Sequence, residues 1–259
     1  MRLFFIADIF DRSGRDAVVR MLPRLREQHE LDLVIANGEN VAAGAGITER
    51  LGESLLAGGV DCITLGNHTW RQKGIGPFLE REPRIVRPAN YLTSLPGRGT
   101  TVVEARDGTR VGVCNLIGVF GLDPPACSPF EIASRLVDEQ KEQTPVVIVD
   151  FHAEATSEKV AMGRHLAGRA TAVLGTHTHV QTNDAQLLTG TAYVTDCGMT
   201  GPHDSVIGVK TELILRRFLT QQPIRFEPAI GDVRVEGAIV DCDPATGRAS
   251  RVSLFRESA

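Results

Sequence analysis

Short, unbroken runs of aliphatic and β-branched residues recur along this chain of 259 residues. Runs of this length and composition are typical of strands that are covered on both faces of a sheet. Segments with helix-start signals separate them. The five runs that we expect to form buried strands are Leu3–Ala7, Leu33–Ala36, Cys62–Leu65, Val146–Val149 and Ala172–Leu174.

Three of the intervening segments carry clear helix signals. One helix is expected over Asp16–Gln28, with Ser13 as its cap. A second is expected over Thr48–Leu56, and a third begins at Ser128-Pro129, where the proline takes the first helical position. Strands that alternate with helices in this way indicate an α/β fold.

Two regions instead predict antiparallel hairpins. Val111–Leu116 follows an Asp107-Gly108 turn, and Val235–Val240 and Arg251–Phe255 flank another turn. No internal repeat or linker interrupts the chain. We therefore expect a single α/β domain over residues 1–259, with mixed sheets and layered helices rather than a purely parallel Rossmann sheet.

The composition of the chain argues against several classes of protein. The chain is 42% hydrophobic and 23% charged, which is ordinary for a globular protein. Its net charge of −4 argues against a general polyanion binder, so no stable nucleic-acid binding is expected. No apolar run reaches the roughly 18 residues of a membrane span. Five scattered cysteines and a start without a cleavable-signal layout predict a cytoplasmic protein with neither a disulfide framework nor a thiolate zinc site.

Potential ligand residues follow each buried run directly. In open α/β sheets, ligands bind outside the carboxyl ends of the strands, so these segments are expected to converge on one pocket. Four of the seven histidines lie in them. The segments are Asp8, Asn37-Gly38-Glu39-Asn40, Gly66-Asn67-His68, Asp150-Phe151-His152 and Gly175-Thr176-His177-Thr178-His179.

Imidazole, carboxylate and amide groups together suit first-row divalent metals such as Mn, Fe or Zn. The candidate ligands outnumber the four that one structural zinc needs, which favours two ions sharing a bridging carboxylate. Because residues i and i+2 of an extended backbone point the same way, His177 and His179 are expected to aim into one site. Two such ions about 3.5–4 Å apart form a clamp for in-line displacement at phosphorus.

With these motifs the chain resembles the calcineurin-like metallophosphoesterases, whose general pattern runs D-x-H, G-D, G-N-H, H and G-H-x-H. It resembles more closely the bacterial YmdB-like subgroup, which has G-E-N in the second block. The resemblance covers nearly the whole chain and implies a four-layer α/β/β/α sandwich with mixed sheets. It also implies a phosphodiesterase acting on small cyclic nucleotides, above all 2′,3′-cyclic ones, with 3′,5′-cyclic nucleotides as further candidates. Its cofactor would be two divalent or mixed-valence first-row ions, with iron or manganese favoured.

The resemblance also assigns roles to individual residues. It puts on one metal Asp8, Glu39, Asn40 and His179. It completes the second metal, to which Glu39 bridges, with Asn67, His152 and His177. His68 stays off the metals as the general acid, protonating the leaving alkoxide or stabilising its charge after in-line attack by a metal-bridging hydroxide.

The chain departs from the general superfamily pattern at three positions. Phe10 stands where a histidine is usual, Glu39 where aspartate is usual, and Thr69 where an acid follows Asn-His. Asn40 is expected to substitute for the missing imidazole, as the subgroup pattern implies. The corresponding expectation is a weaker first metal site.

Two rival functions remain open at this point. One is a phosphomonoesterase or protein phosphatase with the same metal site, and the other is a regulatory, RNA-associated binding protein. The expected partner is a small nucleotide substrate, and a homo-oligomer is left open. Trp70 could stack a base, although core packing is favoured, and Asn37 is interpreted as structural rather than as a ligand.

Overall fold

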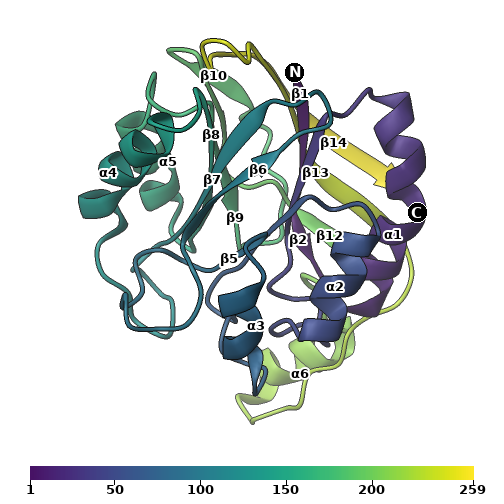
Figure 1. Ribbon diagram of the computed structural model, residues 1–259. Coiled ribbons are helices and arrows are strands. Elements are labelled where there is room, and N and C mark those ends of the chain that lie inside the picture. Colours follow the sequence, from purple (N-terminus) through teal and green to yellow (C-terminus); the bar gives the residue numbers. More distant parts are fainter.

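The computed structural model describes all 259 residues and contains two mixed β-sheets that face each other (Figure 1). The eight-stranded sheet has the order β2 (Asp8–Ile9), β12 (Met199–Pro202), β13 (Val233–Cys242), β1 (Arg2–Ile6), β3 (Leu33–Asn37), β4 (Cys62–Thr64) and β5 (Ile85–Val86), with β14 (Ala249–Ser258) paired to β13. The six-stranded sheet has the order β10 (Gln186–Leu188), β11 (Thr191–Val194), β9 (Ala172–Thr176), β8 (Val146–His152), β7 (Arg110–Ile117) and β6 (Thr100–Glu104).

Helices cover the outer face of each sheet. Those on the eight-stranded sheet are α1 (Asp11–Gln28), α2 (Glu49–Ala57) and α3 (Ile75–Arg81), and those on the six-stranded sheet are α4 (Pro129–Lys141) and α5 (Thr156–His165). Three hydrophobic clusters fill the interfaces between successive layers. The predicted α/β/β/α sandwich with mixed sheets is therefore confirmed. None of the helices is long and apolar enough to cross a membrane.

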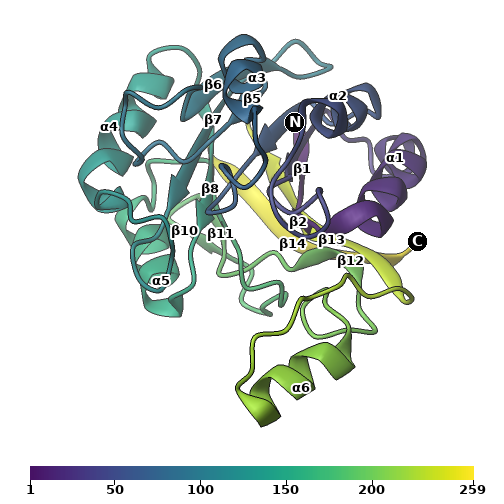
Figure 2. The ribbon, with the colours of Figure 1, turned by 90° about the horizontal axis from the view of Figure 1, so that it is seen from below.

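The sixth helix, α6 (Thr211–Thr220), stands apart from these layers and projects from the body of the molecule (Figure 2). It lies at the end of the molecule toward which the first strand runs (Figure 1). The central strands of each sheet, such as β1 and β3 or β8 and β9, are parallel, so their carboxyl ends meet on the same side. This arrangement brings the loops after the strands close to the segment that carries α6.

The five predicted runs all form strands, and both predicted hairpins pair antiparallel as β6–β7 and β13–β14. The first helix, however, begins at Asp11 rather than Asp16, and Ser13 lies inside it with a buried hydroxyl that has no partner. Tertiary bonds start this helix in place of a side-chain cap, since the Asp11 amide donates to the Asn40 carbonyl at 2.9 Å. Thr48 caps α2 through the Leu51 amide, and Pro129 occupies the first position of α4, as predicted.

Candidate metal centre

The predicted ligand residues come together where strand ends of both sheets meet. Asp8 follows β1, Glu39 and Asn40 follow β3, Asn67 and His68 follow β4, and the remaining histidines come from β8 and β9. Five of them line one cavity of about 330 Å³, namely Glu39, Asn40, His68, His177 and His179. Asp8 and His152 lie fully buried beside them. The convergence that the sequence predicted is thus what the structure contains.

Three donor residues form a compact cluster, which we call the inner group: Glu39, His152 and His177. One ligand atom from each lies within 4.8 Å of the other two. His152 Nε2 is 3.2 Å from Glu39 Oε1, and the two imidazole rings are 4.7 Å apart. Asn67 joins them through its Oδ1, which is 3.0 Å from His152 Nε2.

Asp8, Asn40 and His179 form a neighbouring cluster, the outer group. Asn40 Nδ2 lies at its centre, 3.5 Å from Asp8 Oδ1 and 3.2 Å from His179 Nε2. The same nitrogen is 3.4 Å from Glu39 Oε1, so Glu39 stands between the two groups. That position is the one expected of a carboxylate shared by two ions.

A buried hydrogen-bond network lies behind the inner group. His152 Nδ1 donates to Thr176 Oγ1 at 2.9 Å, and the threonine hydroxyl donates to Asp150 Oδ1 at 2.7 Å. Asp150 also accepts from Thr64 Oγ1 and Asn37 Nδ2. Partners of this kind fix the tautomer and orientation of a metal-binding imidazole, and here they direct Nε2 toward Glu39 and Asn67. Asn37 therefore acts in this network, in line with its structural interpretation.

His177 and His179 reach the centre by a route that differs from the prediction. Their backbone is not extended, because both residues have positive φ angles, 102° and 62°. The turn directs His177 toward the inner group and His179 toward the outer one. The predicted extended backbone is therefore wrong, although the two histidines do line one cavity.

Buried acceptors hold this turn in its strained form. Asp8 Oδ2 accepts from the His177 amide at 3.1 Å, and Asp196 Oδ2 accepts from both the amide and the hydroxyl of Thr178. Asp196 is paired in turn with Lys159 Nζ at 2.5 Å, and both side chains are almost completely buried. Such strained conformations persist only where the surroundings impose them.

The electrostatics of the cluster suit a cation. Asp8 and Glu39 are fully buried, and the ion pairs they form are with histidines. Burial opposes ionisation of Glu39, but His152 and His68 outweigh it and hold the Glu39 pKa well below its usual value. Burial also disfavours the charged form of His152, which lowers the pKa of this imidazole. The nearby Glu39 and Asp8 carboxylates outweigh burial and raise the His152 pKa to about 9. A divalent ion between these groups would replace the proton on the imidazole, because metal binding and protonation compete for the same nitrogen.

At Gly66 the backbone lies close to Glu39 and His152, where there is no space for a side chain. A Cβ on Gly66 would lie 2.3 Å from Glu39 Oε2 and 2.4 Å from His152 Nε2, so no other residue fits here. Glycine is used where backbone must approach closely to a site. The buried carboxylates, the Nε2 atom of His152 beside Glu39 and this cradle together fit a divalent metal.

His68 occupies a different position from the other histidines. Its amide donates to Glu39 Oε2 at 2.9 Å, and its ring Nδ1 lies 2.7 Å from Asn40 Oδ1. The side chain is a quarter exposed and borders the cavity. With Nδ1 engaged, Nε2 is the ring atom available to exchange a proton with a bound molecule.

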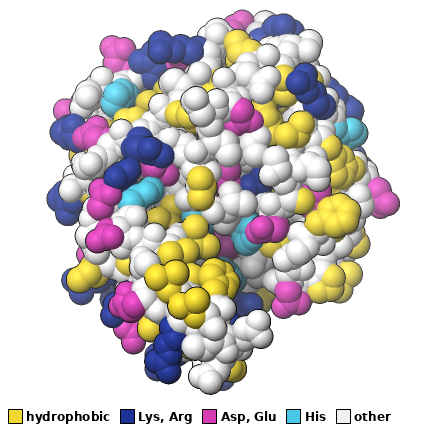
Figure 3. All heavy atoms as spheres, turned by 180° about the vertical axis from the view of Figure 1, so that it is seen from behind, with side chains coloured by type: hydrophobic (Ala, Val, Ile, Leu, Met, Phe, Trp, Pro, Cys, Tyr) yellow, Lys and Arg dark blue, Asp and Glu magenta, His cyan; other side chains and the backbone are white.

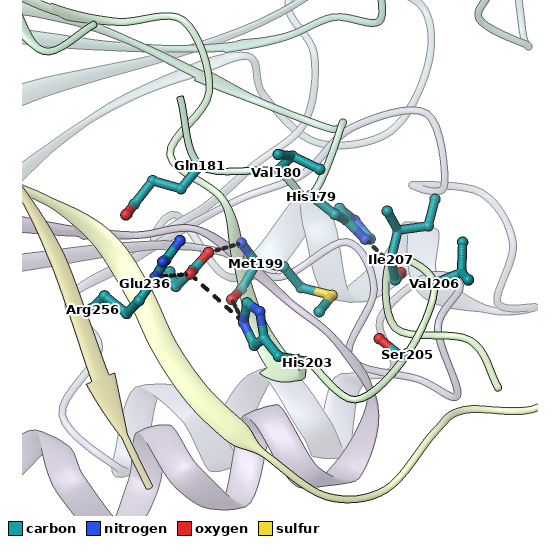
Figure 4. A pocket seen from close by; sticks show the side chains of 10 residues that line it. All are labelled: His179, Val180, Gln181, Met199, His203, Ser205, Val206, Ile207, Glu236 and Arg256. Carbon is teal, nitrogen blue, oxygen red and sulfur yellow. Dashed lines mark hydrogen bonds and ion pairs between the residues drawn. The ribbon is translucent and has the colours of Figure 1, made fainter. Parts of the chain in front are cut away.

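Phe10, which replaces the usual histidine, packs edge-on against His179 with ring centroids 5.7 Å apart. On the other side of His179 lies a separate hollow of about 350 Å³ (Figure 4). There Glu236 accepts from Arg256 Nε at 2.5 Å and from the Met199 amide, and His203 contacts the Met199 carbonyl. His203 thus lies in the loop after β12 and does not line the metal-centre cavity.

Three residues that support the site were not predicted to do so: Asp150, Asp196 and Lys159. Asp150 lies in one of the strand-end segments, but the sequence alone assigns it no role. Asp196 follows the apolar run Ala192–Val194, which repeats the pattern of strand and acidic residue seen elsewhere, so this signal was available. Nothing in the sequence marks Lys159 as buried, because lysine in a helix is ordinarily exposed.

Known proteins resemble the chain over almost its full length. It is 46% identical over 253 residues to a Bacillus subtilis (strain 168) protein named 2′,3′-cyclic-nucleotide 2′-phosphodiesterase, an alignment that covers 97% of this chain and 95% of the relative. A crystal structure of a hypothetical protein from Thermus thermophilus superposes with a TM-score of 0.91 at 42% identity, covering 100% of this chain and 99% of the other. A crystal structure described as a novel phosphatase from Mycoplasma pneumoniae gives 0.92 at 34% identity, covering 100% and 93%.

The family model described as YmdB-like protein matches residues 4–255. This match includes every strand end that contributes to the inner and outer groups. The chain therefore belongs to the YmdB-like protein family.

Proposed function

We propose that this protein is a metal-dependent phosphodiesterase that opens the 2′,3′-cyclic phosphate of small nucleotides. The observation that carries the proposal is the buried Glu39 carboxylate between two donor groups, with His68 beside it on the open side of the cavity. The activity named for the Bacillus subtilis relative, 46% identical to this chain, supports the same substrate class.

The two groups would each hold one divalent ion. The inner ion would be bound by Glu39, Asn67, His152 and His177, and the outer ion by Asp8, Glu39, Asn40 and His179. The Asn40 amide would offer its oxygen after half a turn, since amide oxygen and nitrogen occupy equivalent places. When bound, such ions supply positive charge to the phosphoryl oxygens and make water acidic enough to act as a nucleophile near neutral pH. Iron or manganese is proposed, as the family resemblance implies, and both suit imidazole, carboxylate and amide donors.

In this reaction the protein donates one proton. A bond forms between phosphorus and a water oxygen, and the bond between phosphorus and one ribose oxygen breaks in line with it. The leaving oxygen takes its proton from His68 Nε2. With the Asn40 amide turned, its nitrogen would donate to His68 Nδ1, where its oxygen now lies, and so keep the ring aimed at the cavity with the proton on Nε2. The attacking water releases one proton to solvent and His68 regains a proton from solvent, so a nucleoside monophosphate leaves and the site returns to its starting state.

A phosphatase is the second candidate, because the Mycoplasma pneumoniae structure is described as one. A monoester would bring one more negative charge to the same cleft than a cyclic diester does. Relative rates on a nucleoside monophosphate and on 2′,3′- and 3′,5′-cyclic nucleotides therefore separate these functions. A cytoplasmic location, a single domain over residues 1–259 and the oligomeric state stay predictions.

The decisive experiment strips the protein of metal, reloads it with Mn²⁺ and measures ring opening of a 2′,3′-cyclic nucleotide together with metal content. We expect Asp8→Ala to lose outer metal and activity, and His68→Ala to keep its metal but slow by about 10²–10⁴-fold, the usual contribution of a general acid. His29→Ala is the control, because this histidine lies at the carboxyl end of α1 and does not line the cavity. A wild-type protein that holds two ions but leaves cyclic nucleotides intact would refute the proposal.

A further inference from the structure

An apolar wall faces the metal centre across the cavity. Beside the metal-centre residues, the cavity of about 330 Å³ is lined by Phe10, Ile207, Val209, Ile214 and Phe226, which we call the apolar wall. Four of these five come from the segment that carries α6, which Figure 2 shows projecting from the layered body. Figure 3 shows hydrophobic side chains gathered toward this end of the molecule. The cavity therefore has one charged side and one apolar side.

Backbone hydrogen bonds fix the wall over the cleft. The strip around Phe226 pairs with the strip around Val209: the Lys210 amide donates to the Glu227 carbonyl at 3.1 Å, and the Ala229 amide donates to Gly208 at 2.8 Å. His179 Nδ1 donates to the Ile207 carbonyl at 3.0 Å. A residue of the outer group is thus bonded directly to the wall, so the two sides of the cavity are positioned together.

The backbone of the apolar wall is strained at Ile207. Ile207 has a φ of 47°, which is rare for a β-branched residue. The next residue, Gly208, has a φ of 98°, and a Cβ on it would lie 2.8 Å from the Phe10 ring. Residues held in such conformations cluster at ligand sites.

The wall has a buried base and an exposed rim. Phe10 and Ile214 are buried, whereas Phe226 is 47% and Ile207 49% exposed. A second hollow of about 380 Å³ shares Phe10, Val209 and Phe226 with the first. An aromatic side chain therefore stands half exposed between two hollows, directly across from the charged groups. Volumes in this range accept molecules of nucleotide size.

A ligand that fits both sides must carry an anion at one end and a flat apolar group at the other. We infer that the nucleobase of the substrate stacks on Phe226, with Ile207 and Val209 beside it, while its phosphate faces the inner and outer groups. This inference rests on the proposed function and names the base subsite within it. Trp70 packs against the hydrophobic core, as favoured from the sequence over base stacking.

The wall side chains carry no hydrogen-bonding group that could read the base. Stacking on an aromatic face tolerates every base, because each base has a π-face. We therefore expect adenine, guanine, cytosine and uracil 2′,3′-cyclic nucleotides to be accepted with efficiencies within a few fold of one another.

The test compares two substrates on the Mn²⁺-loaded protein: adenosine 2′,3′-cyclic phosphate and 1-O-methylribose 2′,3′-cyclic phosphate, which lacks the base. The measured quantity is the ratio of their kcat/KM values. Phe226→Ala should lower this ratio on the order of tenfold, mainly through KM for the nucleotide. Phe226→Tyr should preserve it, and Phe226→Leu, which keeps apolar volume without a ring face, should lower it. The matched control is Phe218→Ala on α6, where the side chain is 73% exposed and lines neither hollow.

Binding of adenosine 3′-phosphate, measured by calorimetry, separates the inference from the proposed function. If ring opening is absent but Phe226→Ala weakens this binding while Phe218→Ala does not, the base subsite stands and the proposed reaction fails. If wild type opens the cyclic phosphates of both substrates and Phe226→Ala leaves the ratio of their kcat/KM values unchanged, the proposed reaction stands and the base subsite is refuted. A protein that neither opens the rings nor binds the nucleotide refutes both.

Discussion

The inner and outer groups of the candidate metal centre are supported by different kinds of structure. Behind the inner group, His152, Thr176 and Asp150 are all fully buried and joined by side-chain hydrogen bonds. In the outer group, His179 is bonded to the backbone carbonyl of Ile207, a half-exposed and strained residue of the projecting segment. Phe10 fills the place of a further imidazole there without adding a donor atom.

This difference predicts two unequal metal affinities. Residues that hydrogen-bond to a metal ligand from behind hold it in the right tautomer and orientation. The inner group has such residues in Thr176 and Asp150, so it is preorganised in a way that the outer group is not. The outer group in turn depends on the segment that forms the apolar wall, so its geometry is tied to what lies in the cavity. We expect the inner ion to bind first and to be removed last.

The largest effect is expected for Glu39→Gln, which touches both groups at once. Glutamine keeps the shape but removes the charge that the buried centre shares between its two halves. Both affinities should fall, and activity should drop by more than the roughly 10–100-fold that changes behind a ligand cost. Metal content and ring opening measure this, with the exposed Glu27→Gln on α1 as control. A variant that lost only one ion would show that Glu39 serves a single group.

Lys159→Met should cause the largest loss of stability. It leaves Asp196 buried without its cation, and removing one partner of a buried ion pair costs about 3–5 kcal/mol. Because Asp196 holds Thr178 between His177 and His179, the two histidines proposed as ligands, both metal affinities should also fall. Urea unfolding of the metal-free protein gives the first quantity and Mn²⁺ titration the second. Lys141→Met, exposed on α4, should change neither, and unchanged unfolding in Lys159→Met would contradict the role given to the pair.

The same contrast explains what could be predicted from the sequence. Strands buried on both faces leave continuous apolar runs, and the residue after each run marks the sheet edge, so Asp8, Glu39 and His152 were found by position alone. The turn over His177–His179 was not predicted, because Asp8 and Asp196 impose its left-handed backbone. Asp8 is distant in the chain, and Asp196 follows a strand that was not predicted. Likewise α1 starts early because tertiary hydrogen bonds replace the expected Ser13 cap.

The projecting segment was the least predictable part. No element was predicted over residues 207–229, and although α6 is amphipathic, a helical pattern does not indicate which part of the molecule its apolar side faces. Their position follows from the pairing of Lys210 with Glu227 and of Gly208 with Ala229, and from the bond to His179. These contacts join positions whose local sequence gives no sign of the pairing.

Thr176→Val tests the inner group alone. The substitution keeps the volume but removes the hydroxyl that accepts from His152 and donates to Asp150. Inner affinity should weaken about 10–100-fold while outer affinity changes little. Chelator competition measured separately for each ion resolves the two, and Thr101→Val on β6 controls for the loss of a buried hydroxyl elsewhere. Equal weakening at both ions would mean that the network supports the centre as a whole.

Phe10→His tests the outer group, and its expected effect is the smallest. The new imidazole would lie against His179, where the superfamily pattern has its histidine, and could add a donor to a group that now depends on Asn40. Outer affinity should rise on the order of tenfold, the range over which single metal-site partners act. A polar ring in this glycine-lined space should also cost about 1–3 kcal/mol of stability, because Phe10 packs closely against Gly44 and Gly208. Phe10→Leu removes the ring without adding a donor and should show no gain in affinity. If Phe10→His binds the outer ion no better than Phe10→Leu does, Asn40 already fills the vacant place, and the inequality between the groups comes from the strained support of His179.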